Sequence, residues 1–348
     1  MRFRLSRSSR NSSGSSNRIA AGIAVAVLTG AAGLIGAVAS GAGTPTAQAQ
    51  VVTGSSGSGG PTRLTAPALP PSRTGQSCPV FPAFPDADCT GVPAEVTLSA
   101  YSGPCTVTTA NTVIDAKLVN CDLNIRAAGV VIENSKVNGL VYVDTDDPGS
   151  RQWSFTIQDS EVDAGQEPRA AVSTGNMTVV RADIHGGVTA VQCEEKSVSC
   201  TVRDSWLHGQ YIPDTANWHL GGFLSDGGGN IQLLHNNIVC DHPENSVGEG
   251  CTGDVNFIPN FAPISGALVQ NNLFGANIGS AYCTFGGEKS TSQYPSSDHI
   301  VYRDNVFQRG TNGKCAAYGP VTDFNVNGTG NQWINNKWDD GTVVDPES

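Results

Sequence analysis

The chain has 348 residues, and its 31 acidic and 20 basic side chains give a formal net charge of −11. The only basic residues before position 50 are five arginines, and without that segment 15 basic residues face 31 acidic ones, a net charge of −16. So acidic a surface argues against nucleic acid and anionic membranes as partners.

Residues 1–49 are predicted to be a secretory signal peptide. An arginine-bearing, acid-free start is followed by an uncharged Ala, Gly, Val and Leu stretch, and Ala47-Gln48-Ala49 offers a small-x-small cleavage site. The alternative is an uncleaved membrane anchor, because about 20 apolar residues can span a bilayer. We expect a secreted protein without a membrane partner after cleavage.

Residues 50–77, rich in Gly, Ser, Thr and Pro, are predicted to be a flexible linker, and residues 78–348 to be one monomeric domain. The ten cysteines of an exported chain indicate disulfides rather than metal or redox chemistry. No Cys-x-x-Cys or His-x-x-x-His spacing suggests zinc, so no metal site is predicted. No cofactor is predicted either, and no motif points to Ca²⁺.

A ten-residue repeat runs through this domain, with a degenerate first copy at 112–120. Its third and eighth positions are apolar, and its fifth and sixth positions hold turn-forming pairs. The eight clear copies are 130–139, 155–164, 177–186, 200–209, 231–240, 267–276, 300–309 and 331–340. The sixth position is small or carries an amide: Ser135, Ser160, Ala182, Ser205, Asn236, Asn272, Asn305 and Asn336.

The copies recur every 22 to 36 residues without helical periodicity. Each reads as strand, corner and strand, and has nothing against which to bury its apolar face unless the copies stack. The excess length is expected in one loop per rung. A β-propeller would need roughly 40-residue blades, and the copies are too short and uneven for that.

This pattern resembles the repeats of right-handed parallel β-helix proteins, the pectate-lyase-like superfamily, over about residues 105–340. The resemblance implies an all-β, single-stranded right-handed parallel β-helix (a solenoid) of about 8–9 rungs. It also implies that the sixth-position side chains stack inside the corner and bond to one another and to the main chain. The fold hosts lyases, hydrolases, epimerases, adhesins and inert proteins, so it does not fix an activity.

A third strand per rung should follow each variable loop, with candidates at 140–144, 190–194, 221–225, 281–285 and 315–319. Cys283 and Cys315 lie 32 residues apart, which matches the local rung period. Adjacent rungs are about 4.8 Å apart, within the distance that a disulfide spans, so these two should pair. For the others, nearest-neighbour pairing is simplest: Cys78 with Cys89, Cys105 with Cys121, Cys193 with Cys200 and Cys240 with Cys251. The first pair is expected to tie a cap over the open N-terminal end of the stack.

The ninth position of the repeat points outward and places Asp163, His185 and His208 on three consecutive rungs. Histidine can act as a base near neutral pH, so His185 and His208 are predicted catalytic residues. The alternative is a solvated surface ladder. Asp163 is expected to favour a charged His185 and to leave His208 neutral.

The loop after His208 supplies further candidates. Tyr211 and Trp218 are predicted to stack on sugar rings, while Asp214 and His219 are predicted catalytic groups that hydrogen-bond hydroxyls. The alternative for Trp218 is a cap on the apolar core beneath the loop.

The segment 219–224, "HLGGFL", is similar to a His-x-Asp-Gly-Ile-Gln-like strand of some secreted β-helix proteins. Gly221 stands where that acid would be, so its role is lost or moved to Asp226. Lys289 and Arg309 are predicted substrate-binding residues that neutralise a sugar carboxylate.

These residues predict a secreted protein that acts on extracellular polysaccharide as a lyase or a glycoside hydrolase. A non-catalytic carbohydrate-binding or cell-surface protein of the same fold is the alternative. The Asn-Thr-Asp, paired Asp-Asp and Arg-Ile-Lys set of polygalacturonases does not occur as a set, and the Arg-x-Pro-x-x-Arg signature of pectate lyases is missing.

Overall fold

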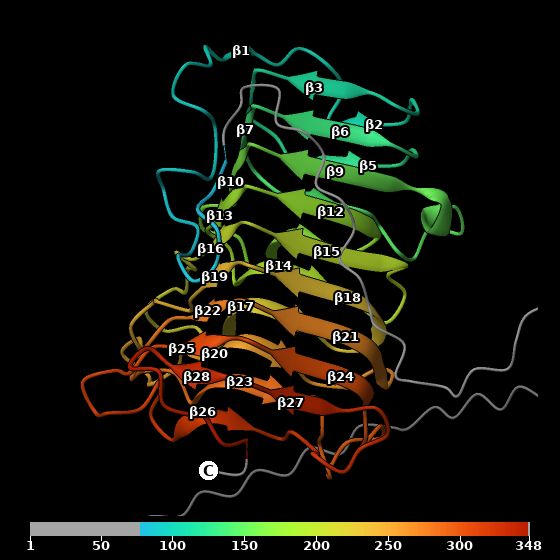
Figure 1. Ribbon diagram of the computed structural model, residues 1–348. Helices are drawn as coiled ribbons and strands as arrows, with labels where there is room; N and C mark the ends of the chain where they lie inside the picture. Colours follow the sequence, from blue (N-terminus) through green and yellow to red (C-terminus); the bar gives the residue numbers. More distant parts are fainter. Residues whose placement is uncertain (1–76, 347–348) are drawn as a thin grey trace, which may run out of the picture. The chain divides into compact units, whose positions relative to one another are not determined.

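The computed structural model describes residues 77–346, which form a stack of parallel strands (Figure 1). The predicted signal peptide and all but the last residue of the predicted linker lie outside the described residues. The strands form three sheets of ten, nine and nine strands, and every strand pair within them is parallel. In the described part the only helical segment is the 3-10 turn η1 (Ser150–Gln152), so no helix there could cross a membrane.

We name the three sheets A, B and C. The chain runs through one strand of sheet C, then one of sheet A and then one of sheet B, and each such circuit makes one rung of a parallel β-helix. This confirms the predicted fold class. Sheet A contains β1 (Ser99–Ala100), β4 (Lys117–Val119), β7 (Lys136–Asn138), β10 (Glu161–Asp163), β13 (Asp183–His185), β16 (Trp206–Leu207), β19 (Asn237–Ile238), β22 (Leu273–Phe274), β25 (Val306–Phe307) and β28 (Lys337–Trp338). Sheet B contains β2 (Thr106–Val107), β5 (Leu123–Ile125), β8 (Val141–Tyr142), β11 (Ala170–Ser173), β14 (Thr189–Cys193), β17 (Leu220–Ser225), β20 (Cys251–Phe257), β23 (Tyr282–Gly286) and β26 (Gly319–Thr322). Sheet C contains β3 (Val113–Asp115), β6 (Val130–Glu133), β9 (Ser154–Gln158), β12 (Asn176–Val180), β15 (Ser199–Arg203), β18 (Gly228–Leu234), β21 (Ile264–Gln270), β24 (Asp298–Arg303) and β27 (Gln332–Ile334).

The corner between sheets C and A explains the turn-forming fifth position of the repeat. Every copy places this residue in the left-handed backbone region, which Asn and Asp tolerate better than other non-glycine residues. The residues are Ala116, Asn134, Asp159, Arg181, Asp204, His235, Asn271, Asp304 and Asn335. In the eight clear copies this backbone reversal turns the sixth-position side chain into the corner, where it is fully or almost fully buried.

The sixth-position asparagines form the expected internal ladder. The backbone N–H and the Nδ2 of Asn236 both donate to Oδ1 of Asn272, at 2.9 and 3.0 Å. Asn272 bonds Asn305 in the same way, and Asn305 bonds Asn336. In the N-terminal rungs the hydroxyl of Ser205 replaces the amide and accepts the N–H of Ala182 at 3.1 Å.

The apolar third and eighth positions fill the interior between the three sheets. Their side chains, such as Ile157 and Val162, have no exposed surface. Toward the C-terminal end the core becomes aromatic, with the rings of Phe274 and Phe307 stacked at 4.3 Å and Tyr302 buried beside them.

The extra length of each rung does not fall in one loop, as the repeat had suggested. Residues 239–250 connect sheet A to sheet B, whereas residues 287–297 connect sheet B to sheet C. Four of the five candidate third strands overlap β8, β14, β17 and β23. The fifth candidate, 315–319, is wrong except for its last residue, because β26 starts at Gly319.

All ten cysteines form the five predicted disulfides. The Cα atoms of Cys283 and Cys315 lie 6.0 Å apart. The two cysteines do not lie opposite each other on adjacent strands, as the rung period had predicted. Tyr282, next to Cys283 in β23, aligns with Gly319 of β26, which comes four residues after Cys315. Cys315 reaches its partner from the loop before β26.

The Cys78–Cys89 disulfide ties down an N-terminal segment, as expected. This segment does not cover the open N-terminal end of the stack, however. Residues 78–93, which we name the strap, lie along the corner between sheets C and A beside the middle rungs (Figure 1). The backbone N–H of Gly91 donates to the carbonyl of Arg181 at 3.1 Å, and Nδ2 of Asn237 donates to the carbonyl of Pro85 at 3.1 Å.

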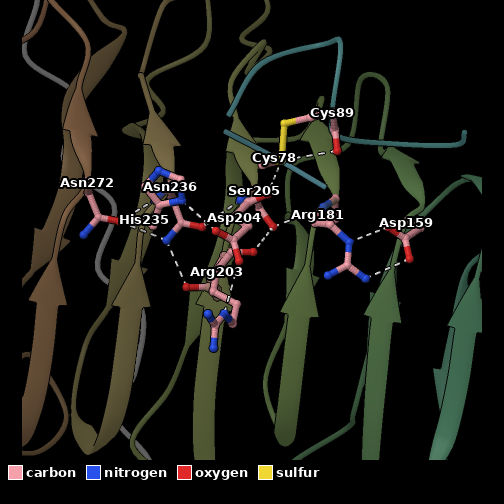
Figure 2. Close-up of polar contacts among 12 residues, drawn as sticks. Cys78, Cys89, Asp159, Arg181, Arg203, Asp204, Ser205, His235, Asn236 and Asn272 are labelled. Carbon is pink, nitrogen blue, oxygen red and sulfur yellow. Dashed lines mark hydrogen bonds and ion pairs between the residues drawn. A yellow bond between two sulfur atoms is a disulfide. The ribbon is translucent and has the colours of Figure 1, made fainter. Parts of the chain in front are cut away.

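His235 fastens the middle of the strap to the β-helix, and Figure 2 shows this histidine near Asp204. Its Nε2 lies 2.8 Å from the carbonyl oxygen of Ala83, and its Nδ1 lies 2.6 Å from Oδ1 of Asp204. A carbonyl and a carboxylate only accept hydrogen bonds, so both ring nitrogens must donate and the imidazole must be charged. Burial opposes this charge, but the hydrogen bonds to Asp204 and Ala83 outweigh it and the nearby Arg203, and they raise the pKa of His235 above 6.5.

We expect the strap to loosen as pH rises. A raised folded pKa means that the contribution of His235 is fully present below pH 6.5 and is lost as pH rises through the folded value. Denaturant unfolding should therefore show a larger fall in stability over this range in the wild type than in His235→Gln, where the raised pKa values of His185 and Asp226 still contribute. His299→Gln, at an exposed histidine beside Asp298, should keep the larger fall. Identical pH profiles for His235→Gln and the wild type would contradict this role.

Candidate functional site

A groove of about 370 Å³ opens on the outer face of sheet B. Two of the predicted site residues, His219 and Lys289, line it, and His185 and His208 do not. Its lining is Thr189, His219, Leu220, Leu224, Thr252, Asn256, Ile258, Asn260 and Lys289.

Two glycines make room for the side chain of Asn256, which lines this groove. The register of β14, β17 and β20 aligns Thr189, Gly221 and Gly253 on successive rungs. A Cβ atom at Gly221 would lie 2.4 Å from Nδ2 of Asn256, and one at Gly253 would lie 2.7 Å from its Oδ1. Only glycine at both positions leaves room for the Asn256 side chain where it lies.

Asn256 brings an unused hydrogen-bond acceptor to this groove. Its residue is 3% exposed, and its Nδ2 donates to the carbonyl of Gly253 at 3.0 Å. Its Oδ1 has no hydrogen-bond partner within the protein. Buried polar atoms are nearly always paired, so a ligand hydroxyl that turned this amide toward the groove would give Oδ1 the partner that it lacks.

Apolar and aromatic side chains extend the same face toward the C-terminal end. Leu224, Asn256 and Phe285 align on β17, β20 and β23. The ring of Phe285 contacts Tyr282 edge-on at 5.7 Å, and Tyr282 lies 5.7 Å from the ring of Tyr318. Tyr318 is 69% exposed, which leaves an aromatic face open to a ligand.

Lys289 supplies the positive charge of the groove. Its Nζ donates to Oδ1 of Asn260 at 3.1 Å. It also lines a second hollow of about 70 Å³, which shares Ile258 with the groove. Glu288 and Asp323 line this second hollow, and burial raises the pKa of Asp323 although Lys289 counteracts it.

Asp226, the position to which the role of the acid replaced by Gly221 was predicted to have moved if it was not lost, is absent from the lining of the groove. It follows β17 directly, and its carboxyl group is buried with Oδ1 unpaired. Burial, followed by the charges of Glu194 and Glu195, raises the pKa of Asp226 to about 7. A carboxyl group in this state could donate a proton near neutral pH.

His185 and His208 lie on the outer face of sheet A, and their rings are 5.5 Å apart. His208 also stacks on Trp206 at 3.5 Å. Each histidine meets an acid from the rung before it: Nε2 of His185 lies 3.0 Å from Oε1 of Glu161, and Nε2 of His208 lies 2.9 Å from Oδ1 of Asp183.

The pKa of His185 is shifted in the direction that favours its charged form, as expected. Burial disfavours its protonated form, but the hydrogen bond to Glu161 and the charges of Asp183 and Asp163 raise the pKa of His185. The same hydrogen bond, with Lys136 2.7 Å away, lowers the pKa of Glu161 to about 2 although burial opposes this. Asp163 contributes as expected, but Glu161 makes the closer contact.

The remaining predicted residues have structural contacts. Trp218 packs on the small apolar cluster of Ile212, Leu220, Cys240 and Cys251 beneath its loop. Asp214 accepts the backbone N–H of Ser246 at 3.1 Å and joins two loops. Arg309 bonds Asp340 at 3.0 Å and lies over the ring of Trp338, near the C-terminal end. The half-buried Tyr211 begins the same loop as Trp218, and its backbone N–H bonds Gly187.

Sequence reasoning missed Asn256, Leu224 and Tyr282. The available signal was the pair of glycines at 221 and 253, which lie inside strands. A glycine inside a strand often marks a place where another group approaches closely. The acids Glu161 and Asp183 were missed because only the ninth repeat position was considered, and they occupy the seventh.

No protein-family model, curated protein or solved structure matches this chain.

Proposed function

We propose that this protein is secreted and binds an extracellular polysaccharide chain along the groove of sheet B. The observation that carries the proposal is the groove itself, where Asn256 and Thr252 offer polar groups beside Leu224 and the charge of Lys289. The five disulfides are consistent with an extracellular protein. The likeness of the repeat to the pectate-lyase-like superfamily supports the same class of ligand.

The lining suits a sugar chain in each of its parts. Sugar rings carry hydroxyl groups at their edges and C–H groups on their faces. The amide of Asn256 and the hydroxyl of Thr252 can bond the edges, while Leu224 and the Tyr318 ring can contact the faces. Lys289 would favour a sugar that bears a carboxylate, such as a uronate.

If the protein is an enzyme, this groove favours a lyase over a hydrolase. A lyase needs a base for the proton beside a carboxylate and a cation that neutralises the carboxylate. His219 and Lys289 supply one of each. A hydrolase ordinarily uses two carboxylates, and among the described residues those that line the groove include neither Asp nor Glu. A non-catalytic binding protein would use the same contacts without His219.

We expect Lys289→Gln to weaken binding of an acidic polysaccharide about tenfold while binding of a neutral one persists, because one charge-assisted contact is lost. Titration against a polysaccharide panel measures this. Lys117→Gln, whose lysine bonds Ser99 in the first rungs, should bind like the wild type. If both lysine variants bind equally, the groove is not the site.

The same panel, read for ultraviolet absorbance of unsaturated products and for new reducing ends, separates the enzyme from the binding protein. In the enzyme, His219→Ala should remove about 10²–10⁴ of turnover without loss of affinity. Binding without either product supports the non-catalytic alternative.

A further inference from the structure

Three side chains that offer metal ligands meet on the outer face of sheet A, away from the groove residues. Glu161 and Asp163 come from β10, and His185 comes from β13, whose register sets Asp163 beside His185. One donor atom from each of the three lies within 4.8 Å of the others. Their side chains are between 23% and 36% exposed, so an ion from solvent could reach them.

The two ring nitrogens of His185 have different surroundings. Nε2 lies 3.0 Å from Glu161, a hydrogen bond that fixes the proton on this nitrogen. Nδ1 lies 3.6 Å from Oδ1 of Asp163, and it offers a lone pair there once the imidazole has lost its second proton, as binding of a metal ion requires. The separation of these two atoms is too long for a hydrogen bond. Two ligands bound tetrahedrally at about 2.1 Å from one zinc ion lie about 3.4 Å apart, so the separation fits a shared ion.

We propose that Nδ1 of His185 and the carboxylate of Asp163 bind a divalent transition-metal ion of the zinc class, while Glu161 orients the imidazole through Nε2. An imidazole nitrogen with carboxylate oxygens suits such an ion better than Ca²⁺, which prefers oxygen ligands throughout. Because the site joins adjacent rungs, a bound ion would cross-link them.

The neighbouring Lys136 competes with the imidazole of His185 for Glu161, and two other histidine–carboxylate pairs serve as controls for metal binding. Nζ of Lys136 lies 2.7 Å from Oε1 of Glu161 and occupies one of its acceptor positions. The His208–Asp183 pair and the exposed His299–Asp298 pair each combine one imidazole with one carboxylate, and neither belongs to a set of three ligand residues. If the site is real, it should be separable from both pairs.

Calorimetric titration of the chelator-treated, disulfide-bonded secreted chain with Zn²⁺ tests the proposal. We expect one equivalent to bind, with a loss of at least about tenfold in affinity in both His185→Ala and Asp163→Asn. His299→Ala should bind like the wild type. Lys136→Gln should bind more tightly, because it removes an ammonium group that competes with the imidazole for Glu161 and repels the ion.

Three results would overturn the site: no saturable Zn²⁺ binding, equal losses in His185→Ala and His299→Ala, or weaker binding in Lys136→Gln. A second measurement does not depend on a variant's folding. In the wild type, Zn²⁺ should shift the imidazole NMR resonances of His185 before those of His299, and the reverse order contradicts the proposal.

Discussion

Replacing Arg181 by Met should destabilise the protein by about 3–5 kcal/mol, because it leaves the carboxylate of Asp159 buried without its partner. The two side chains are 5% and 1% exposed. Nε and Nη2 of Arg181 donate to the two carboxylate oxygens of Asp159 at 2.6 and 2.9 Å, a two-pronged contact visible in Figure 2. Denaturant unfolding curves measure the loss.

The matched test is the double variant Arg181→Met with Asp159→Asn. It removes the stranded charge, so much of the lost stability should return, since buried ion pairs contribute little net free energy over neutral replacements. Arg169→Met is the control, because Arg169 pairs with Asp122 at a position where its side chain is 50% exposed. It should cost about 1 kcal/mol or less. A double variant less stable than Arg181→Met alone would show that the pair itself, and not relief of a buried charge, matters.

The sequence contained the partners of this ion pair without revealing the pairing. Asp159 and Arg181 both occupy the fifth repeat position, on adjacent rungs, and so do Asp204 and His235. Alignment of the repeat therefore places them side by side. What it could not show is that the strap covers this corner and helps to bury it, because no repeat relates residues 78–93 to the rungs.

The candidate groove was harder to predict than the fold for a similar reason. The rungs can be predicted because their apolar positions recur in every copy of the repeat. The groove depends on Gly221, Gly253 and Asn256, and no recurring position of the repeat predicts them. The pairing between β17 and β20 also shifts register between Leu220 and Gly221. A one-residue shift changes which side chains face outward, and periodicity alone does not reveal it. The histidines of sheet A were placed on the correct face because their position belongs to the repeat.

Replacing Asn272 by Leu should cost about 3 kcal/mol, because this side chain is bonded on both sides within the ladder. Its Nδ2 donates to the carbonyl of Leu233 at 2.8 Å and to Oδ1 of Asn305 at 3.0 Å. Its Oδ1 accepts the backbone N–H and the Nδ2 of Asn236. Asn272 has no exposed surface, so water cannot replace these bonds, and each buried group left unpaired costs about 1–3 kcal/mol.

Asn272→Ser separates the ladder from simple packing. Serine fills the same position in the N-terminal rungs, where Oγ of Ser205 accepts the N–H of Ala182. A serine at 272 can therefore still receive the N–H of Asn236, although it is smaller than leucine and leaves a cavity. If hydrogen bonding governs the corner, Asn272→Ser should be more stable than Asn272→Leu in denaturant unfolding. If packing volume governs it, the order should reverse, because leucine nearly conserves the volume of asparagine and serine does not.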